Sequence, residues 1–201
     1  MLLRSSPASP FGRKVKIAAD ILGLSPQITV TVSDTLDPSD PLRGDNPLGK
    51  LPVLVLEDGS SFYDSRVIVE YLDHLAGGNQ ILPAEPKHRF AALRLQALCD
   101  GILDAALLIV YEGRFRAVEK QDTSWLTHQQ GKVDRGLAAL EVSLPPLSAS
   151  ADIGQITAAC TFGYLDLRFE GKWRQNHPKL VGWLSEFAAK YPIFEKTKMV
   201  T

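Results

Sequence analysis

The sequence predicts an α/β part over residues 1–77 followed by an all-helical part over residues 86–201. Short β-branched runs and an Asp-Gly turn, which are typical of strands and hairpins, occur before residue 77. After residues 79–86, which have the composition of a linker, the apolar residues recur at helical spacing. A chain of 201 residues is long enough for two such parts.

The chain begins with a pattern of strand, loop and helix start. Leu2 and Leu3 open the strand, and Ser9 is a candidate N-cap with Pro10 at the first helical position. The helix has one apolar face, made of Val15, Ala18, Ala19 and Leu22, and Gly23 is its stop signal. Backbone N–H groups at a helix start lack intrahelical partners, so this loop is a predicted anion site.

The rest of the α/β part is predicted from short runs of apolar and β-branched residues. Strands are expected at residues 28–32, 52–56 and 61–63, and an Asp-Gly turn joins the last two. A helix capped by Asp64 or Ser65 follows, with an apolar face of Ile68, Tyr71, Leu72 and Leu75. This order implies one parallel strand pair with a right-handed crossover and additional antiparallel strands.

The second part contains four helical patterns, over residues 95–109, 125–142, 156–167 and 178–192. The third has almost no charge, so we expect it to be buried at the centre. Asp152 and Gln155 have the spacing of a capping box at its start. The large aromatic residues expected in the core are Trp173, Trp183 and Phe187.

Charge and cysteine content limit the partners and the setting. The 22 basic and 23 acidic residues nearly balance, so we expect no nucleic-acid partner. No apolar run is long enough to cross a bilayer, and the N-terminus lacks a signal-peptide pattern, so no membrane association is expected. Cys99 and Cys160 have no paired-motif spacing, which favours a reduced, cytoplasmic setting. The histidines lack metal-ligand spacing, so no metal site is expected.

Four motifs, in this order along the chain, resemble those of the glutathione transferase family. They are Ser9-Pro10-Phe11-x-Arg13-Lys14-Val15, Asn46-Pro47-Leu48-Gly49-Lys50-Leu51-Pro52, Asp64-Ser65-x-x-Ile68-x-x-Tyr71-Leu72 and Asp152-x-x-Gln155. The first lies where classes of the family that do not use Tyr place an activating Ser or Cys. The chain therefore resembles a bacterial, cytosolic member of the Ser/Cys type. The resemblance implies a thioredoxin-like N-terminal domain, an all-helical C-terminal domain and a homodimer.

The resemblance also implies that glutathione is the co-substrate and that Ser9 stabilises its thiolate. Phe11 would belong to the same site, and Ser5 and Ser6 are reserve candidates for the hydroxyl. Lowering a thiol pKa from about 8.5 by two units needs roughly 2.7 kcal/mol. A helix N-terminus gives about 0.3–1 kcal/mol and a hydroxyl hydrogen bond roughly 1.5–3 kcal/mol, so both together suffice. Periodicity alone favours a plain N-cap at Ser9, whereas the four motifs together favour the functional role.

The second and third motifs carry the other glutathione-binding residues that the resemblance implies. Pro52 resembles the cis-proline of the family, which would leave the Leu51 N–H and C=O free to pair with the cysteinyl backbone. Ser65 would bind the γ-glutamyl carboxylate at a helix N-terminus, and Asp64 would accept from the γ-glutamyl amine. Lys50 would meet the glycyl carboxylate or remain a solvated loop lysine.

The long helix offers candidates for the second-substrate pocket. Tyr111, Arg114 and Phe115 would line a pocket for a small electrophile, or serve as core and surface residues. Arg13 is expected on the surface, with a carboxylate or the other part as its alternative partner. Asp100 and Asp104 are expected on a solvated face, with the cleft or the glutathione of a partner subunit as the alternative.

These residues predict an enzyme, a glutathione transferase of the kind used in detoxification, which adds the glutathione thiolate to an electrophile that the sequence does not identify. One alternative is a non-catalytic, glutathione-binding or regulatory protein of the same fold. Another is a glutathione-dependent thiol reductase or peroxidase. The second alternative is disfavoured because Ser9 stands where a thiol would be needed, and because Cys99 and Cys160 lie in apolar stripes.

Overall fold

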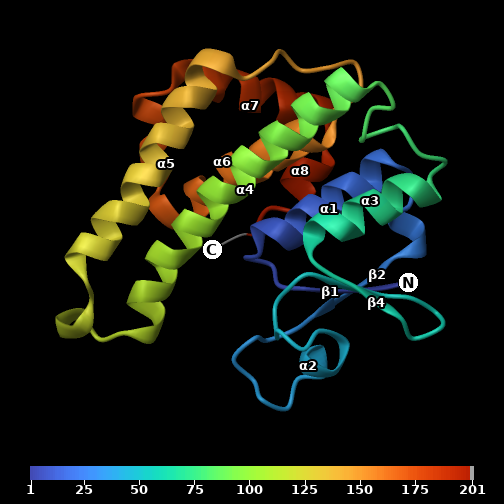
Figure 1. The fold of residues 1–201 in the computed structure, drawn as a ribbon, viewed down its shortest axis with the longest axis horizontal. Helices are drawn as coiled ribbons and strands as arrows, with labels where there is room; N and C mark the ends of the chain where they lie inside the picture. Colours follow the sequence, from blue (N-terminus) through green and yellow to red (C-terminus); the bar gives the residue numbers. More distant parts are fainter. Residues whose placement is uncertain (200–201) are drawn as a thin grey trace.

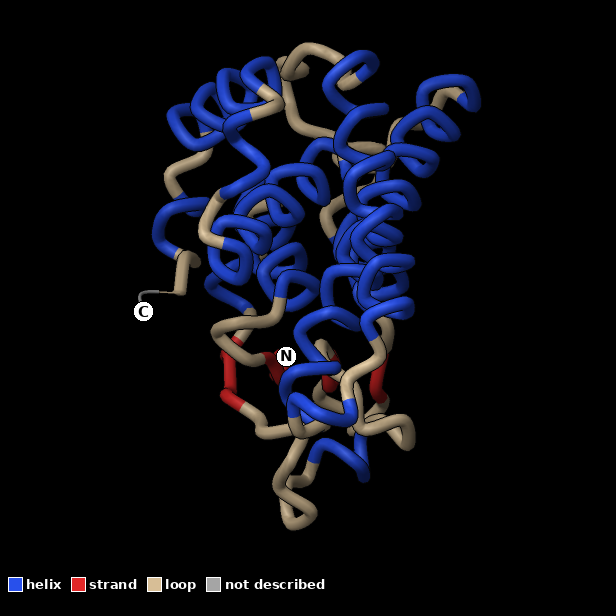
Figure 2. Tube along the Cα trace, turned by 90° about the vertical axis from the view of Figure 1, so that its left-hand side faces the viewer, coloured by secondary structure: helices blue, strands red, loops and turns tan. Residues whose placement is uncertain are grey.

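The computed structural model describes residues 1–199 as a sheet-containing part and a helical part (Figures 1 and 2). The first part contains β1 Leu2–Ser5, α1 Pro10–Ile21, β2 Thr29–Val32, α2 Leu42–Asp45, β3 Val53–Val55, β4 Ser61–Phe62 and α3 Ser65–Leu75. The second part contains α4 Pro86–Phe115, α5 Thr123–Ser143, α6 Ile153–Phe169, α7 Pro178–Lys190 and α8 Ile193–Lys196. The predicted fold class, a thioredoxin-like α/β part followed by helices, is confirmed.

The four strands form one mixed sheet in the order β2-β1-β3-β4. β1 pairs in parallel with β2, with Leu3 beside Val30, because α1 carries the chain back across the sheet. β3 pairs antiparallel with both β1 and β4, and its pairing with β4 is the hairpin that the turn at Asp58-Gly59 predicted. Figure 1 shows α1 and α3 between the sheet and the helical part, whereas α2 lies at the far end of the molecule. The starts of α1 and α3 are thereby held beside the second part.

The charge-poor helix α6 is the centre of the second part, as predicted. Twelve of its residues are buried, and it packs against both α4 and α1. The Gln155 N–H donates to the Asp152 carboxylate at 2.9 Å, which is one half of the predicted capping box. The other half is not formed, because the Gln155 Oε1 accepts from the Ser148 N–H at 3.3 Å instead, while its Nε2 donates to the Pro146 carbonyl. Trp173, Trp183 and Phe187 are buried in the core, as predicted.

Close packing at the start of α6 depends on Gly154. A Cβ at this position would lie 2.7 Å from the backbone oxygen of Ala92 in α4, which has no freedom to move aside. We expect Gly154→Ala to lower the free energy of unfolding by about 1–3 kcal/mol through overpacking. Urea unfolding measures this loss. Gly182→Ala in α7 is the matched control, because a Cβ there meets nothing within 4 Å and should stabilise by about 0.4–1 kcal/mol. Equal effects of the two substitutions would contradict the packing argument.

A buried ionic cluster joins the two parts and corrects the expectation for Asp100. Its carboxylate is 1% exposed and accepts from the fully buried Lys14 Nζ at 2.6 Å. Arg66 Nε, at the start of α3, donates to the other oxygen at 3.2 Å. Asp100 is therefore an interior residue between α1, α3 and α4, while Asp104 is exposed as expected. The sequence predicts an exposed position for Asp100, because the two cations that pair with it lie far away along the chain.

Arg13 is also buried, contrary to the surface position expected for it. It is 7% exposed, and its guanidinium packs over the Phe194 ring, with the Cζ atom 4.0 Å from the ring centroid. Nε donates to Thr197 Oγ1 at 3.2 Å, and Nη2 donates to the Phe194 carbonyl. Gly163 in α6 leaves room for it, since a Cβ there would collide with the guanidinium. Arg13 thus holds the end of the chain against α1.

The linker between the two parts is held by one carboxylate. Asp73, near the end of α3, is 4% exposed and accepts hydrogen bonds from the backbone N–H groups of Asn79, Gln80 and Ile81 at 2.8–3.0 Å. These N–H groups would otherwise be left without partners. Across residues 1–199, no helix is both long enough and apolar enough to cross a membrane.

Candidate functional site

Ser9 lies at the start of α1, where the sequence predicted it. Its Oγ accepts a hydrogen bond from the Gly12 N–H at 3.0 Å, and its backbone is extended, as at an N-cap. A hydroxyl that accepts one hydrogen bond keeps its own proton free to donate. Ser9 is half-buried rather than sealed. The residue therefore caps the helix and can still donate to an anion in front of it.

The two reserve hydroxyls differ from Ser9 in access. Ser5 is 1% exposed and lies against Gly12, so tightly that a Cβ on Gly12 would collide with the Ser5 Oγ. Its hydroxyl points to the Ser6 carbonyl at 3.4 Å, a long contact. Ser6 is half-buried. Access and hydrogen bonding both favour Ser9 over Ser5 as the donor.

The loop before β3 has the backbone form expected of it. The Leu51–Pro52 peptide bond is cis, as predicted. Among residues 1–199, neither the N–H nor the C=O of Leu51 forms a hydrogen bond, so both are available to an extended ligand. Asn46, which is 2% exposed, shapes this loop: its amide donates to the Lys50 carbonyl at 2.9 Å and accepts from the Leu48 N–H at 3.0 Å. Asn46 is a supporting residue to which the sequence reasoning gave no role.

The predicted carboxylate and amine contacts lie at the start of α3. Asp64 is the N-cap and accepts from the Arg66 N–H at 2.9 Å, while the side chain of Ser65 is buried beneath it. The pKa of Asp104 is raised, first by burial and then by Asp100, and is opposed by Arg66 and Lys50. Lys50 and Asp64 therefore lie close enough to the Asp104 carboxylate to affect its pKa. The region therefore offers both signs of charge to a zwitterionic ligand.

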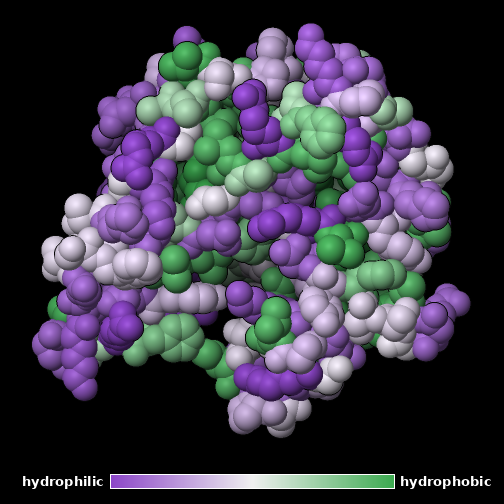
Figure 3. Space-filling model, viewed as in Figure 1, coloured by the Kyte–Doolittle hydropathy of each residue, from purple (hydrophilic) through white to green (hydrophobic). Residues whose placement is uncertain are grey.

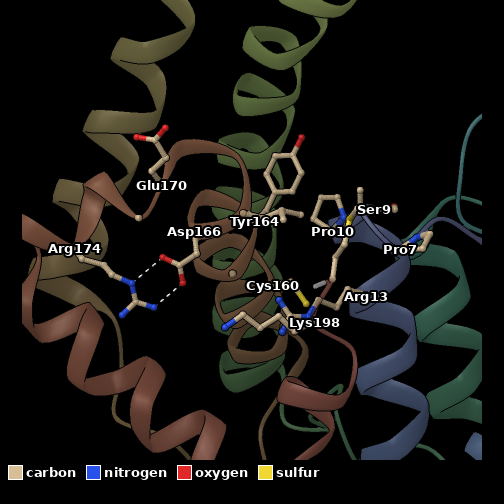
Figure 4. Close-up of a pocket in the computed structure, with 15 residues that line it drawn as sticks. Pro7, Ser9, Pro10, Arg13, Cys160, Tyr164, Asp166, Glu170, Arg174 and Lys198 are labelled. Atoms are coloured by element: carbon tan, nitrogen blue, oxygen red, sulfur yellow. Dashed lines mark hydrogen bonds and ion pairs between the residues drawn. The ribbon is translucent and has the colours of Figure 1, made fainter. Parts of the chain in front are cut away.

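A cavity of about 440 Å³ lies beside Ser9 (Figure 4). Its walls are the loop at Pro7, the start of α1, the later turns of α6 and the chain end near Lys198. Tyr164 projects from α6 into the space opposite Ser9 (Figure 4), and burial raises the pKa of its phenol. Arg13 forms part of the cavity wall as well. Tyr164 was not predicted here, because α1 and α6 are far apart in the sequence, and for Arg13 a position facing the other part was the alternative to the surface.

Two of the three predicted second-substrate residues line another cavity, while Tyr111 and Arg114 also lie near enough to Tyr164 to affect the pKa of its phenol. Tyr111, Phe115 and Trp125 line a separate cavity of about 490 Å³. This cavity lies where the C-terminal end of α4 meets the start of α5. Their rings meet edge to face with centroids 5.4 Å apart, and Arg114 Cζ lies 5.3 Å from the Tyr111 ring centroid. Figure 3 shows a notch between these helix ends and the N-terminal part. A role of Tyr111, Arg114 and Phe115 toward the second substrate stays a prediction.

Both cysteines are unsuited to surface thiol chemistry. Cys99 and Cys160 are completely buried and unpaired with each other, as their apolar stripes predicted. Burial raises the pKa of the Cys160 thiol to about 11 and that of Cys99 further still. A reactive cysteine needs the opposite, a lowered pKa and access. Among residues 1–199, no group of three His, Cys, Asp or Glu residues is arranged to hold a metal ion.

Comparison with known families identifies both parts of the chain. The family model described as glutathione S-transferase, N-terminal domain, matches residues 3–80. The model described as glutathione S-transferase, C-terminal domain, matches residues 123–186. A GST-like protein of Escherichia coli K12, YibF, is 35% identical over 191 residues, which is 90% of each chain.

Solved structures give the same result at the level of the backbone. A glutathione S-transferase of Methylobacillus flagellatus with glutathione bound is 37% identical, with a TM-score of 0.91 over 99% of each chain. A family member from Pseudomonas fluorescens Pf-5 is 39% identical, with a TM-score of 0.89 over 100% of each chain. That protein was crystallised with S-(propanoic acid)-glutathione and also with glutathione.

Proposed function

The chain belongs to the glutathione S-transferase family, and from this premise we propose that it is an enzyme that binds reduced glutathione and adds its thiolate to an electrophilic small molecule. The observation that carries the proposal is the Ser9 hydroxyl, which caps α1, keeps a free proton and borders a cavity of about 440 Å³. Relatives crystallised with glutathione support the choice of co-substrate.

In this proposal the α/β part binds glutathione. Leu51 pairs with its cysteinyl backbone after the cis Pro52, and Lys50 meets the glycyl carboxylate. Asp64 and Ser65 hold the γ-glutamyl group at the start of α3, where free N–H groups favour a carboxylate. Phe11, half-buried in the first turn of α1, supports the loop that carries Ser9. The protein supplies position and charge stabilisation, and glutathione supplies the nucleophile.

Four further parts complete the hypothesis: the first and third rest on sequence patterns, and the second and fourth on the family resemblance. We propose domain boundaries at residues 1–77 and 86–201, a homodimer, a cytoplasmic location and a role in detoxification. The thiol-reductase alternative is weakened by the two buried cysteines, whose pKa values are raised. The remaining alternative, a protein that binds glutathione without catalysis, differs from our proposal in activity only.

The test is to measure binding and conjugation on the full chain. We expect calorimetry to show binding of reduced glutathione, and we expect the protein to accelerate conjugation of an activated aryl chloride above the spontaneous rate. Binding without conjugation of any electrophile would favour the non-catalytic alternative. Absence of binding would contradict both readings.

A further inference from the structure

One hydrogen-bond donor in the cavity that Ser9 borders has no partner within the described residues, 1–199. The guanidinium of Arg13 has five N–H groups, of which Nε and Nη2 are directed to Thr197 and Phe194. Among residues 1–199, Nη1 forms no hydrogen bond and Arg13 forms no ion pair. The side chain is 7% exposed and forms part of the wall of the cavity that Ser9 borders (Figure 4). A buried guanidinium whose Nη1 N–H groups have no partner can bind an anion.

The carboxylates near Arg13 are already engaged. Asp166 accepts two hydrogen bonds from the Arg174 guanidinium, at 2.7 and 2.6 Å, and one from Trp173 at 2.9 Å. Glu195 lies 3.9 Å from the Lys198 ammonium. Glu170, on the cavity wall, pairs with Lys172 at 3.1 Å. Among residues 1–199, Arg13 is thus a buried cation of this cavity that has no carboxylate at ion-pair distance.

The spacing of Arg13 and Ser9 limits the size of the anion. Ser9 is the N-cap of α1 and Arg13 is the fourth residue of the helix, so their backbones are separated by about one turn, about 6 Å along the axis, and both residues line the same cavity. A molecule that reaches from Arg13 to a thiolate held at Ser9 therefore has its anionic group within a few bonds of the carbon under attack. A carboxylate matches the planar fork of a guanidinium.

Resting on the proposed function, we propose that Arg13 is a specificity-determining residue that binds the carboxylate of the second substrate. The enzyme then prefers small electrophiles that carry a carboxylate close to the reacting carbon. Iodoacetate is such a compound. The glutathione thiol gives its proton to solvent, the thiolate sulfur bonds to the CH₂ carbon, and iodide leaves with the electron pair of the broken C–I bond. Arg13 takes no part in the bond changes and holds the carboxylate.

The test compares iodoacetate with iodoacetamide, which has nearly the same shape and no charge. For wild type we expect kcat/KM, corrected for the spontaneous rates, to favour iodoacetate at least tenfold. Arg13→Gln should remove this preference, mainly by raising the KM of iodoacetate. Lys16→Gln is the matched control, because Lys16 lies on the next turn of α1 and outside the cavity wall; it should change the ratio less than twofold.

Three results with iodoacetate, its amide or their inhibitory analogues would overturn the inference, and two results on overall activity would also reject it. The first is an unchanged ratio in Arg13→Gln, and the second is an equal change in Lys16→Gln. The third applies if the variant does not fold: propanoate should inhibit wild-type conjugation of the aryl chloride and propanamide should not, so equal inhibition contradicts the inference. Conjugation of the aryl chloride without conjugation of iodoacetate also rejects it and leaves the proposed function standing. If no electrophile is conjugated, the proposed function itself fails and the inference fails with it.

Discussion

Replacing Asp100 by Ala is expected to lower the free energy of unfolding by about 3–5 kcal/mol. The Asp100 carboxylate lies 2.6 Å from the Lys14 Nζ, and both side chains are almost completely buried. Without Asp100, the ammonium of Lys14 is left between α1 and α4 with no counter-ion, which is the costly way to break a buried pair. For a chain of this length, such a loss corresponds to a fall of roughly 10 °C in Tm. Urea unfolding followed by circular dichroism measures it.

The structure offers a matched control on the same carboxylate. Arg66 Nε lies 3.2 Å from the other oxygen of Asp100, but the Arg66 side chain is 56% exposed. Arg66→Ala should therefore cost no more than about 1 kcal/mol, because water screens and replaces an exposed cation. The double substitution Lys14→Met with Asp100→Leu should recover much of the loss, since it removes both buried charges. Similar losses for Asp100→Ala and Arg66→Ala would contradict the view that burial sets the cost.

The features that the sequence predicted well are local ones. The Ser9 cap, the Asp64 cap and the Asp58-Gly59 turn each depend on residues within a few positions, so the chemistry of the run itself specifies them. The buried position of α6 follows from its near lack of charge, which is also a property of one segment. The cis form of Pro52 was anticipated from the family resemblance rather than from any local rule.

The features that were missed depend on contacts between distant segments. Lys14 and Asp100 are 86 positions apart, and Arg13 and Phe194 are 181 apart, so no local pattern distinguishes them from solvated charges. The cavity beside Ser9 was missed for the same reason, since Tyr164 reaches it from α6. Helical periodicity identifies an apolar face of a helix. The charged residues of a buried ion pair do not fit that apolar pattern, so the sequence predicts them to be exposed.

Replacing Ser9 by Ala is expected to lower kcat/KM for conjugation at pH 7 by about 10–100-fold. A hydroxyl hydrogen bond to a charged sulfur contributes roughly 1.5–3 kcal/mol, so its loss should raise the pKa of bound glutathione by about 1–2 units. The thiolate fraction at neutral pH falls accordingly. The rates of the two proteins should converge as the pH rises through the higher pKa of the variant, because the thiol ionises without help there. A pH profile of kcat/KM measures both effects.

Controls separate this role from the cap that Ser9 also provides. Ser9→Gly removes the hydroxyl at a capping cost of only a few tenths of a kcal/mol, so it should lose activity while keeping its stability. Ser9→Thr keeps both the donor and the cap and should retain most of the activity. Ser6→Ala removes the half-buried hydroxyl three residues earlier in the same loop and should change kcat/KM less than twofold.

The shape of the pH profile decides between the two roles of Ser9. A loss of activity that is the same at every pH would show that Ser9 acts through the position of α1 rather than on the thiolate. A loss in Ser6→Ala that disappears at high pH would move the assignment to that hydroxyl. Because Ser5 is sealed behind Gly12, Ser6 and Ser9 are the hydroxyls of this loop that an incoming thiolate can reach.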